Sequence, residues 1–178
     1  MLTRSIGLVL AYTIYYIASH PVAQSRLSSE LRTLDQPIPF LDNWHADGIQ
    51  PRRLSSPQSL VKLTYLTAVI KESLRMRPNS TPLPRVTPSD RSVTIAGVEA
   101  IPPSTRVNCF QWFLHRDPDT WSNPNEWFPE RWLGEDGSEK DKMPPLWAFA
   151  SGPRMCIGDH LTYYCTYFAY TLSVRYIC

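Results

Sequence analysis

Three features that would each indicate a class of protein are missing from this chain. Its four cysteines include no close Cys-x-x-Cys pair, which argues against a structural zinc site and a small disulfide scaffold. The apolar run at residues 6–18 is shorter than the roughly 20 residues that a membrane-spanning helix needs. The formal net charge of +2 is too small to indicate a nucleic acid or an acidic membrane surface as partner. We therefore expect a globular domain that binds no nucleic acid.

Glycine is also scarce, whereas proline is abundant. The 17 prolines in 178 residues are roughly twice the usual share of about 5%, and they cluster between Pro37 and Pro153. We expect the middle of the chain to consist of loops, turns and short strands between helices. Only seven glycines are present, and two of them, Gly152 and Gly158, flank Cys156.

Hydrophobic periodicity and helix-breaking residues predict helices at residues 5–19, from 21 onward, from 56 to near 78, and from 159 toward 175. In the second of these helices, the residues expected to be buried are Val22, Leu27, Leu31 and Leu34. Short β-branched runs predict a hairpin of residues 93–95 and 98–101 and a further strand at 105–110. The sequence therefore predicts a mainly α fold with a small β region.

The ten residues FASGPRMCIG contain the most specific pattern in the chain. A thiolate such as that of Cys156 can be the axial ligand of haem iron. Gly152 and Gly158 remove side chains where the backbone must lie close to a flat cofactor. Arg154 can pair with a haem propionate, and Phe149 can shield the sulfur from water. The alternative for a single cysteine is an inert packing residue in a glycine turn.

This segment resembles the haem-ligand loop of the cytochrome P450 family, Phe-x-x-Gly-x-Arg-x-Cys-x-Gly, and matches every fixed position. The resemblance implies haem b as cofactor and Cys156 as its axial iron ligand. It also implies cofactor-binding roles for a set of nearby residues: Phe149, Gly152, Arg154 and Gly158. The match favours a ligand over an inert cysteine.

Two further motifs follow the order found in that family. Glu72 and Arg75 form Glu-x-x-Arg, which by itself indicates no more than a surface ion pair. The resemblance implies that Arg131, in the segment FPERW, joins them in a buried structural triad behind the haem. It implies that Arg85 reaches a haem propionate, whereas we expect His115 to be a hydrogen-bonded structural residue.

A pair of residues that relatives use for proton delivery is not matched. The resemblance places an acid and an alcohol within residues 1–6, where this chain has Arg4 and Ser5. Ser5 is a weak candidate for the alcohol, and arginine cannot replace the acid. We assign no catalytic residue beyond this candidate.

The resemblance implies that residues 1–178 are the C-terminal part of a P450 domain, without its N-terminal half and last hairpin. That part comprises the end of the long central helix, the Glu-x-x-Arg helix, short β hairpins, the cysteine loop and the following helix. We expect the helix at residues 5–19 to be left uncovered and the chain to be poorly soluble or unstable by itself.

The function implied by the resemblance is that of a monooxygenase. Full-length relatives insert one oxygen atom from O2 into a small organic substrate, with electrons from NADPH through NADPH–cytochrome P450 reductase. They are usually anchored in the endoplasmic reticulum membrane, but no anchor is recognised in this sequence. We expect the 178 residues alone to be inactive. The alternatives are a truncated, non-catalytic family remnant and a haem-responsive binding module.

Overall fold

The computed structural model describes residues 2–34, 57–78 and 84–177. The helices are α1 (Leu2–Ala18), α2 (Pro21–Leu31), α3 (Pro57–Val61), α4 (Thr64–Met76), α5 (Gln111–Leu114) and α6 (Asp159–Ile177). The strands are β1 (Arg85–Val86), β2 (Val93–Ile95), β3 (Val98–Ile101) and β4 (Arg106–Val107). Two 3-10 turns are η2 (Pro129–Trp132) and η3 (Gly152–Arg154). The mainly α fold with a small β region is confirmed.

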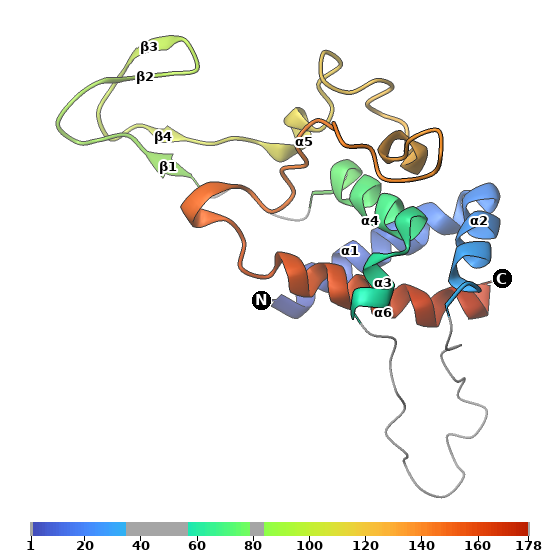
Figure 1. Cartoon of the computed structure of the whole chain (residues 1–178). Helices are drawn as coiled ribbons and strands as arrows, with labels where there is room; N and C mark the ends of the chain where they lie inside the picture. The colour runs from blue at the N-terminus through green and yellow to red at the C-terminus, as the bar shows by residue number, and fades with distance from the viewer. Residues whose placement is uncertain (1, 35–56, 79–83, 178) are drawn as a thin grey trace, which may run out of the picture.

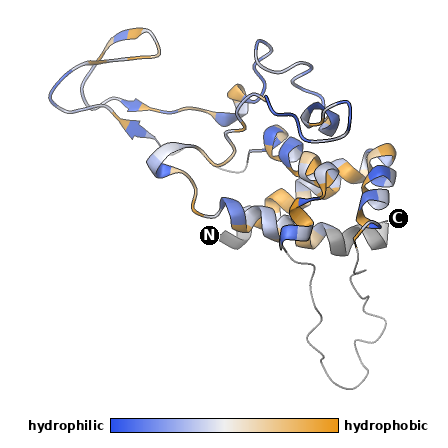
Figure 2. Ribbon diagram, viewed as in Figure 1, coloured by the Kyte–Doolittle hydropathy of each residue, from blue (hydrophilic) through white to orange (hydrophobic). Residues whose placement is uncertain are grey.

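Helices α1, α2, α4 and α6 contact one another and enclose the hydrophobic core. Figure 2 shows hydrophobic residues recurring along α1 and α4, which lie within this group. The residues with no exposed surface in the core come from α2, α3 and α4: Leu27, Leu60, Leu66, Val69 and Ile70. The strands β2 and β3 stand away from the helices (Figure 1). The fold is therefore a group of helices with a projecting β hairpin.

Helix α1 is covered on one face only. Val9, Thr13 and Ile17 are buried, whereas Tyr12 and Tyr15 are 39% and 64% exposed. This spacing is that of two opposite faces of one helix. The prediction that the helix would be left uncovered is therefore only partly correct, because one face of α1 is buried in the core. Among the described residues, no single helix has both the length and the apolar content to cross a membrane. Residues 5–18 of α1 and the whole of α2 reach that length and apolar content only when taken together, and the chain bends by 110° between them.

The helix predicted from residue 56 to near 78 is interrupted, and α3 and α4 meet at Leu63. Ser56, the predicted first residue of that helix, lies outside the described residues. The start of α4 is instead capped by Glu30 of α2, whose carboxylate accepts the backbone N–H groups of Tyr65 and Leu66 at 2.7 and 2.8 Å. These groups have no partner within their own helix, so a carboxylate from another helix stabilises the break.

The predicted buried stripe of α2 is only partly correct. Leu27 is fully buried and Leu31 and Leu34 lie partly buried against the core, as expected. Val22 is 80% exposed, so that part of the prediction is wrong. Val22 lies in the first turn of α2, directly after the bend of 110° between α1 and α2.

The predicted hairpin is confirmed, with Val93 opposite Ile101 in β2 and β3. Ala96 and Gly97 connect the strands with φ values of 49° and 80°, which is the conformation that two-residue hairpin turns require. The strand predicted at residues 105–110 is shorter, because β4 pairs only with the two residues of β1 and the chain then enters α5.

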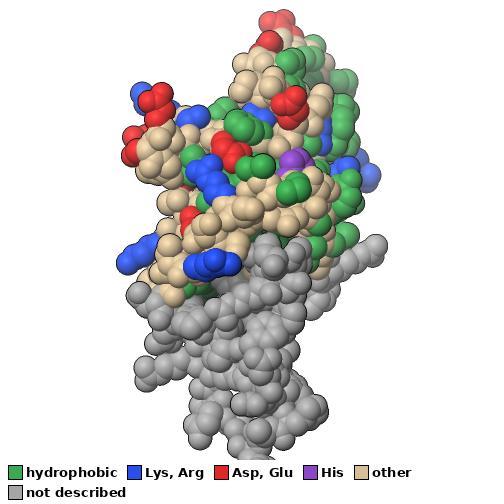
Figure 3. All heavy atoms as spheres, turned by 90° about the vertical axis from the view of Figure 1, so that its right-hand side faces the viewer, with side chains coloured by type: hydrophobic (Ala, Val, Ile, Leu, Met, Phe, Trp, Pro, Cys, Tyr) green, Lys and Arg blue, Asp and Glu red, His purple; other side chains and the backbone are tan. Residues whose placement is uncertain are grey.

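Charged side chains of both signs are interspersed on the face shown in Figure 3. One pair joins two elements of the fold: Arg26 of α2 lies 3.4 Å from Glu130 of η2. The guanidinium of Arg26 also lies 4.4 Å from the ring centre of Tyr65. Both charged groups are partly exposed, so water screens the pair and its contribution to stability is small.

A buried carboxylate makes the stronger connection between α4 and η2. Glu72 is fully buried, and Arg75 donates to it twice, from Nε at 3.0 Å and from Nη2 at 2.9 Å. Arg131 of η2 donates from Nε at 3.0 Å. The backbone N–H of Phe128 and the indole N–H of Trp132 each donate at 2.9 Å. The two oxygens of Glu72 thus accept from both charged and neutral donors.

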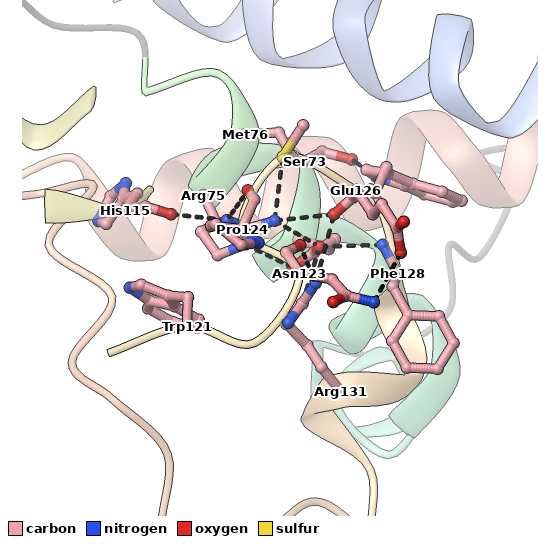
Figure 4. A network of polar contacts seen from close by, with 12 residues as sticks. Ser73, Arg75, Met76, His115, Trp121, Asn123, Pro124, Glu126, Phe128 and Arg131 are labelled. Carbon is pink, nitrogen blue, oxygen red and sulfur yellow. Dashed lines mark hydrogen bonds and ion pairs between the residues drawn. The ribbon is translucent and has the colours of Figure 1, made fainter. Parts of the chain in front are cut away.

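The two arginines are also bonded to the irregular segment between α5 and η2. Their remaining N–H groups donate to backbone carbonyls, those of His115, Ser122, Asn123, Pro124 and Glu126. Two guanidinium groups and one carboxylate leave one positive charge without a counter-ion. Backbone carbonyl oxygens surround this charge and accept its hydrogen bonds. A segment with little regular secondary structure is held in place by side chains from α4 and η2 (Figure 4).

We expect Glu72→Gln to destabilise the chain by about 3–5 kcal/mol, because two buried guanidinium groups lose their counter-ion. The measurement is the free energy of unfolding in urea. Glu99→Gln is the matched control, since Glu99 is exposed on β3, and we expect it to change stability by about 0.5 kcal/mol or less. Equal losses in the two variants would contradict the role of the buried carboxylate.

We expect Glu30→Ala to lower the free energy of unfolding by about 1–2 kcal/mol, because two N–H groups at the start of α4 lose their acceptor. Urea unfolding of Glu30→Ala and Glu99→Ala provides the comparison. A Glu30→Ala variant as stable as the wild-type chain would show that the cap contributes nothing.

Candidate functional site

The cysteine loop is closed by two backbone hydrogen bonds. The N–H of Cys156 donates to the carbonyl of Phe149 at 2.9 Å, and the N–H of Met155 donates to that of Gly152 at 3.0 Å. The loop spans residues 149–158, contains η3 and leads into α6. Cys156 is exposed, so its thiol is held by a defined turn and is accessible from outside.

The sulfur of Cys156 lies beside the N-terminus of a long helix. The N–H of Gly158 points to the sulfur at 3.4 Å, and α6 begins at the next residue, Asp159. An N–H donor and the positive end of a helix dipole both place positive electrostatic potential next to the sulfur. This environment suits a thiolate that acts as a ligand.

Gly152 has a conformational reason to be glycine. Its φ is +72°, which side chains other than glycine rarely adopt. No other atom lies within 4 Å of the position that a Cβ would occupy, so the space beside it is open. Gly158, in contrast, is buried at the start of α6. The positive φ thus explains the glycine at position 152.

The base of the loop packs on α6. The ring of Phe149 lies 5.6 Å from that of Tyr163, which in turn lies 6.2 Å from that of Tyr167. The hydroxyl of Tyr167 is 2.7 Å from that of Thr67 on α4. Burial raises the pKa of Tyr163 far above its usual value, so this phenol stays protonated and neutral. The contacts connect the loop to α6 and, through Tyr167, to α4.

The two arginines expected to pair with haem propionates lie at the surface. Arg154 ends η3, two residues before Cys156, and Arg85 begins β1. Both are exposed, so either guanidinium is accessible to a carboxylate ligand. Ser5, the weak candidate for proton delivery, is exposed in the first turns of α1.

The donor set fits a haem better than a bare metal ion. Among the residues that the structure describes, no three His, Cys, Asp or Glu side chains gather to hold a metal. A single exposed sulfur with open space beside Gly152 suits a group that brings its own remaining ligands, as a porphyrin does. The residues present therefore fit the cofactor that the sequence implies.

The structure brings Glu72, Arg75 and Arg131 into direct contact. It also shows two connections for which the sequence carries no signal. One is the cap on α4 by Glu30, and the other runs through His115. His115 is fully buried, and its Nε2 accepts the backbone N–H of Trp147 at 2.9 Å. Our expectation of a hydrogen-bonded structural histidine is confirmed.

Comparison with known proteins gives a consistent result. The family model described as Cytochrome P450 matches residues 5–164. The chain is 34% identical over 161 residues to cytochrome P450 monooxygenase ankB of Aspergillus thermomutatus, covering 89% of this chain and 27% of that protein. It is 34% identical over 170 residues to cytochrome P450 monooxygenase penB of Penicillium thymicola, covering 94% and 34% of the two chains.

A mammalian relative shows a similar likeness. Cytochrome P450 3A6 of Oryctolagus cuniculus is 34% identical over 151 residues, which are 84% of this chain and 26% of that protein. The chain thus spans between 26% and 34% of the length of these three relatives. Since the family model covers residues 5–164 of 178, the chain belongs to the cytochrome P450 family.

Proposed function

We propose that these residues form the haem-binding part of a P450 monooxygenase and that Cys156 is the axial ligand of the iron in haem b. The observation that carries this proposal is the exposed thiol of Cys156, held by a closed turn at the N-terminus of α6. Membership of the P450 family implies a haem cofactor and supports the same assignment.

Each residue of the proposed haem site has a separate task. Cys156 supplies the sulfur, and the N–H of Gly158 and the end of α6 stabilise negative charge on it. Phe149, packed on Tyr163, limits access of water to the sulfur side. Arg154 and Arg85 bind the propionates by charge-assisted hydrogen bonds.

The buried triad has a positioning task. Glu72, Arg75 and Arg131 hold η2 and the preceding segment against α4 and touch no reacting atom. The hydroxyl of Ser5 is the candidate for a proton donor, with Arg4 beside it in place of an acid.

Haem held by these residues would supply the activation of O2 by which one oxygen atom enters a small organic substrate, with electrons from NADPH through a reductase. Curated relatives named as cytochrome P450 monooxygenases support this reaction class. We propose no particular substrate, since the chain spans 27% and 34% of the length of those relatives.

We expect purified chain that is mixed with haem, reduced and exposed to carbon monoxide to show the Soret band of a thiolate-ligated haem. Cys156→Ala removes the ligand and should abolish this band. Cys109→Ala is the matched control, because Cys109 is also an exposed free cysteine and should leave the band unchanged.

Absence of haem uptake by the wild-type chain would contradict the proposal and favour a non-catalytic remnant. Haem uptake without NADPH-dependent turnover in the presence of a reductase would favour a binding module.

We expect Arg154→Ala and Arg85→Ala each to weaken haem binding by about 10- to 100-fold, since each loses a charge-assisted hydrogen bond to a propionate. The dissociation constant is measured by titration with haem. Arg91→Ala provides the control, because Arg91 is an exposed arginine paired with Asp90. An equal effect of all three substitutions would show only a general loss of positive charge.

A further inference from the structure

His115 lies between the buried triad and the cysteine loop. On one side, Nη1 of Arg75 donates to the backbone carbonyl of His115 at 2.6 Å. On the other side, the imidazole accepts the backbone N–H of Trp147 at 2.9 Å. Arg75 also binds Glu72, so polar contacts run without interruption from that carboxylate to the segment before the cysteine loop.

Trp147 continues the connection toward the loop. Its indole N–H donates to the hydroxyl of Ser151 at 2.8 Å, and its carbonyl accepts the N–H of Ala150 at 3.3 Å. Ser151 directly precedes Gly152, the first residue of η3. Phe149 lies between Trp147 and Ser151, and its carbonyl accepts the N–H of Cys156. A displacement of Trp147 would therefore disturb the residues on both sides of Phe149, whose carbonyl closes the turn that holds the thiol.

The hydrogen bond fixes the protonation state of the imidazole. Because Nε2 accepts from Trp147, it carries no proton, and the proton of the neutral ring is on Nδ1. Among the described residues, Nδ1 of His115 is buried and has no hydrogen-bond partner. The ring is thus a buried acceptor for a backbone N–H of the segment that leads into the loop.

We propose that the neutral imidazole of His115 is a positioning residue for the Cys156 loop, and that its protonation releases residues 147–156 from the body of the protein. The importance of this loop for haem binding rests on the proposed function, whereas the release itself is a property of the polypeptide.

Protonation disrupts the contact directly. A second proton on Nε2 would face the N–H of Trp147, so two donors would meet where a donor and an acceptor met before. The added charge would be buried close to the guanidinium groups of Arg75 and Arg116. Within the described part of the chain, the negative charge that acts on the ring is that of Glu72, which already binds two guanidinium groups.

The direction of the pH effect follows from these contacts. Burial is the largest cause that lowers the pKa of His115 from 6.5 to about 4. The backbone of Arg75 and the charge of Glu72 act in the opposite direction, and the charges of Arg75 and Arg116 act in the same direction as burial. In the released loop the ring regains the ordinary pKa. The closed loop is therefore fully stable above about pH 6.5 and becomes less stable as the pH falls toward about 4, below which the loss is complete.

Amide hydrogen exchange of the purified chain tests the proposal. After correction for the intrinsic rate, we expect exchange of the Trp147 and Cys156 amides to rise by about 10- to 100-fold between about pH 7.5 and about pH 4.5. His115→Gln keeps an acceptor within reach of Trp147 and does not titrate, so exchange should stay slow at both pH values. His115→Leu lacks the acceptor, so exchange should be fast at both.

Two controls separate local release from other effects. His160→Gln removes a histidine whose side chain is 99% exposed and should behave like the wild type. Amides of α4 should exchange more slowly than those of the loop at both pH values, since release leaves α4 folded. Loop amides that exchange only as fast as those of α4, or a His115→Gln variant with the wild-type pH response, would overturn the proposal. The hydrogen-exchange experiment uses the chain without haem. A failure of the chain to bind haem would therefore contradict only the proposed function and would leave this proposal standing.

Discussion

The carboxylate of Glu72 is the interaction on which the rest of this structure depends. It is fully buried and accepts donors from its own helix, from η2 and from the backbone between them. A buried charge of this kind is tolerated only when hydrogen bonds replace the lost water, and here two guanidinium groups and two neutral N–H groups do so. The segment that these contacts hold has little regular secondary structure, so without them only a few backbone hydrogen bonds would define its path.

The cysteine loop is held by two sets of contacts, and one of them begins at this network. His115 connects Arg75 to Trp147, and the aromatic contacts of Phe149 connect the loop to α6. The thiol of Cys156 can therefore be exposed and still well positioned, because the residues before and after it are fixed by buried groups. An exposed sulfur held in this way fits the role of an axial ligand to a cofactor of the P450 family.

Local patterns in the sequence predicted much of this fold, and long-range contacts account for what they missed. The turn at Ala96 and Gly97 and the start of α6 at Asp159 have local causes, and both were predicted. The break at Leu63 depends on Glu30 from another helix, which periodicity cannot show. The loop motif identified Cys156 through resemblance, but no pattern linked it to His115, because that hydrogen bond joins residues 32 positions apart.

We propose that Cys156 binds haem iron from a loop held by the buried triad. X-ray absorption at the iron edge of the haem-loaded chain tests it most directly, because this measurement distinguishes sulfur from nitrogen and oxygen neighbours of the metal. We expect one sulfur neighbour in the wild-type chain and none in Cys156→Ser. An iron bound only by nitrogen and oxygen in the wild-type chain would contradict the claim.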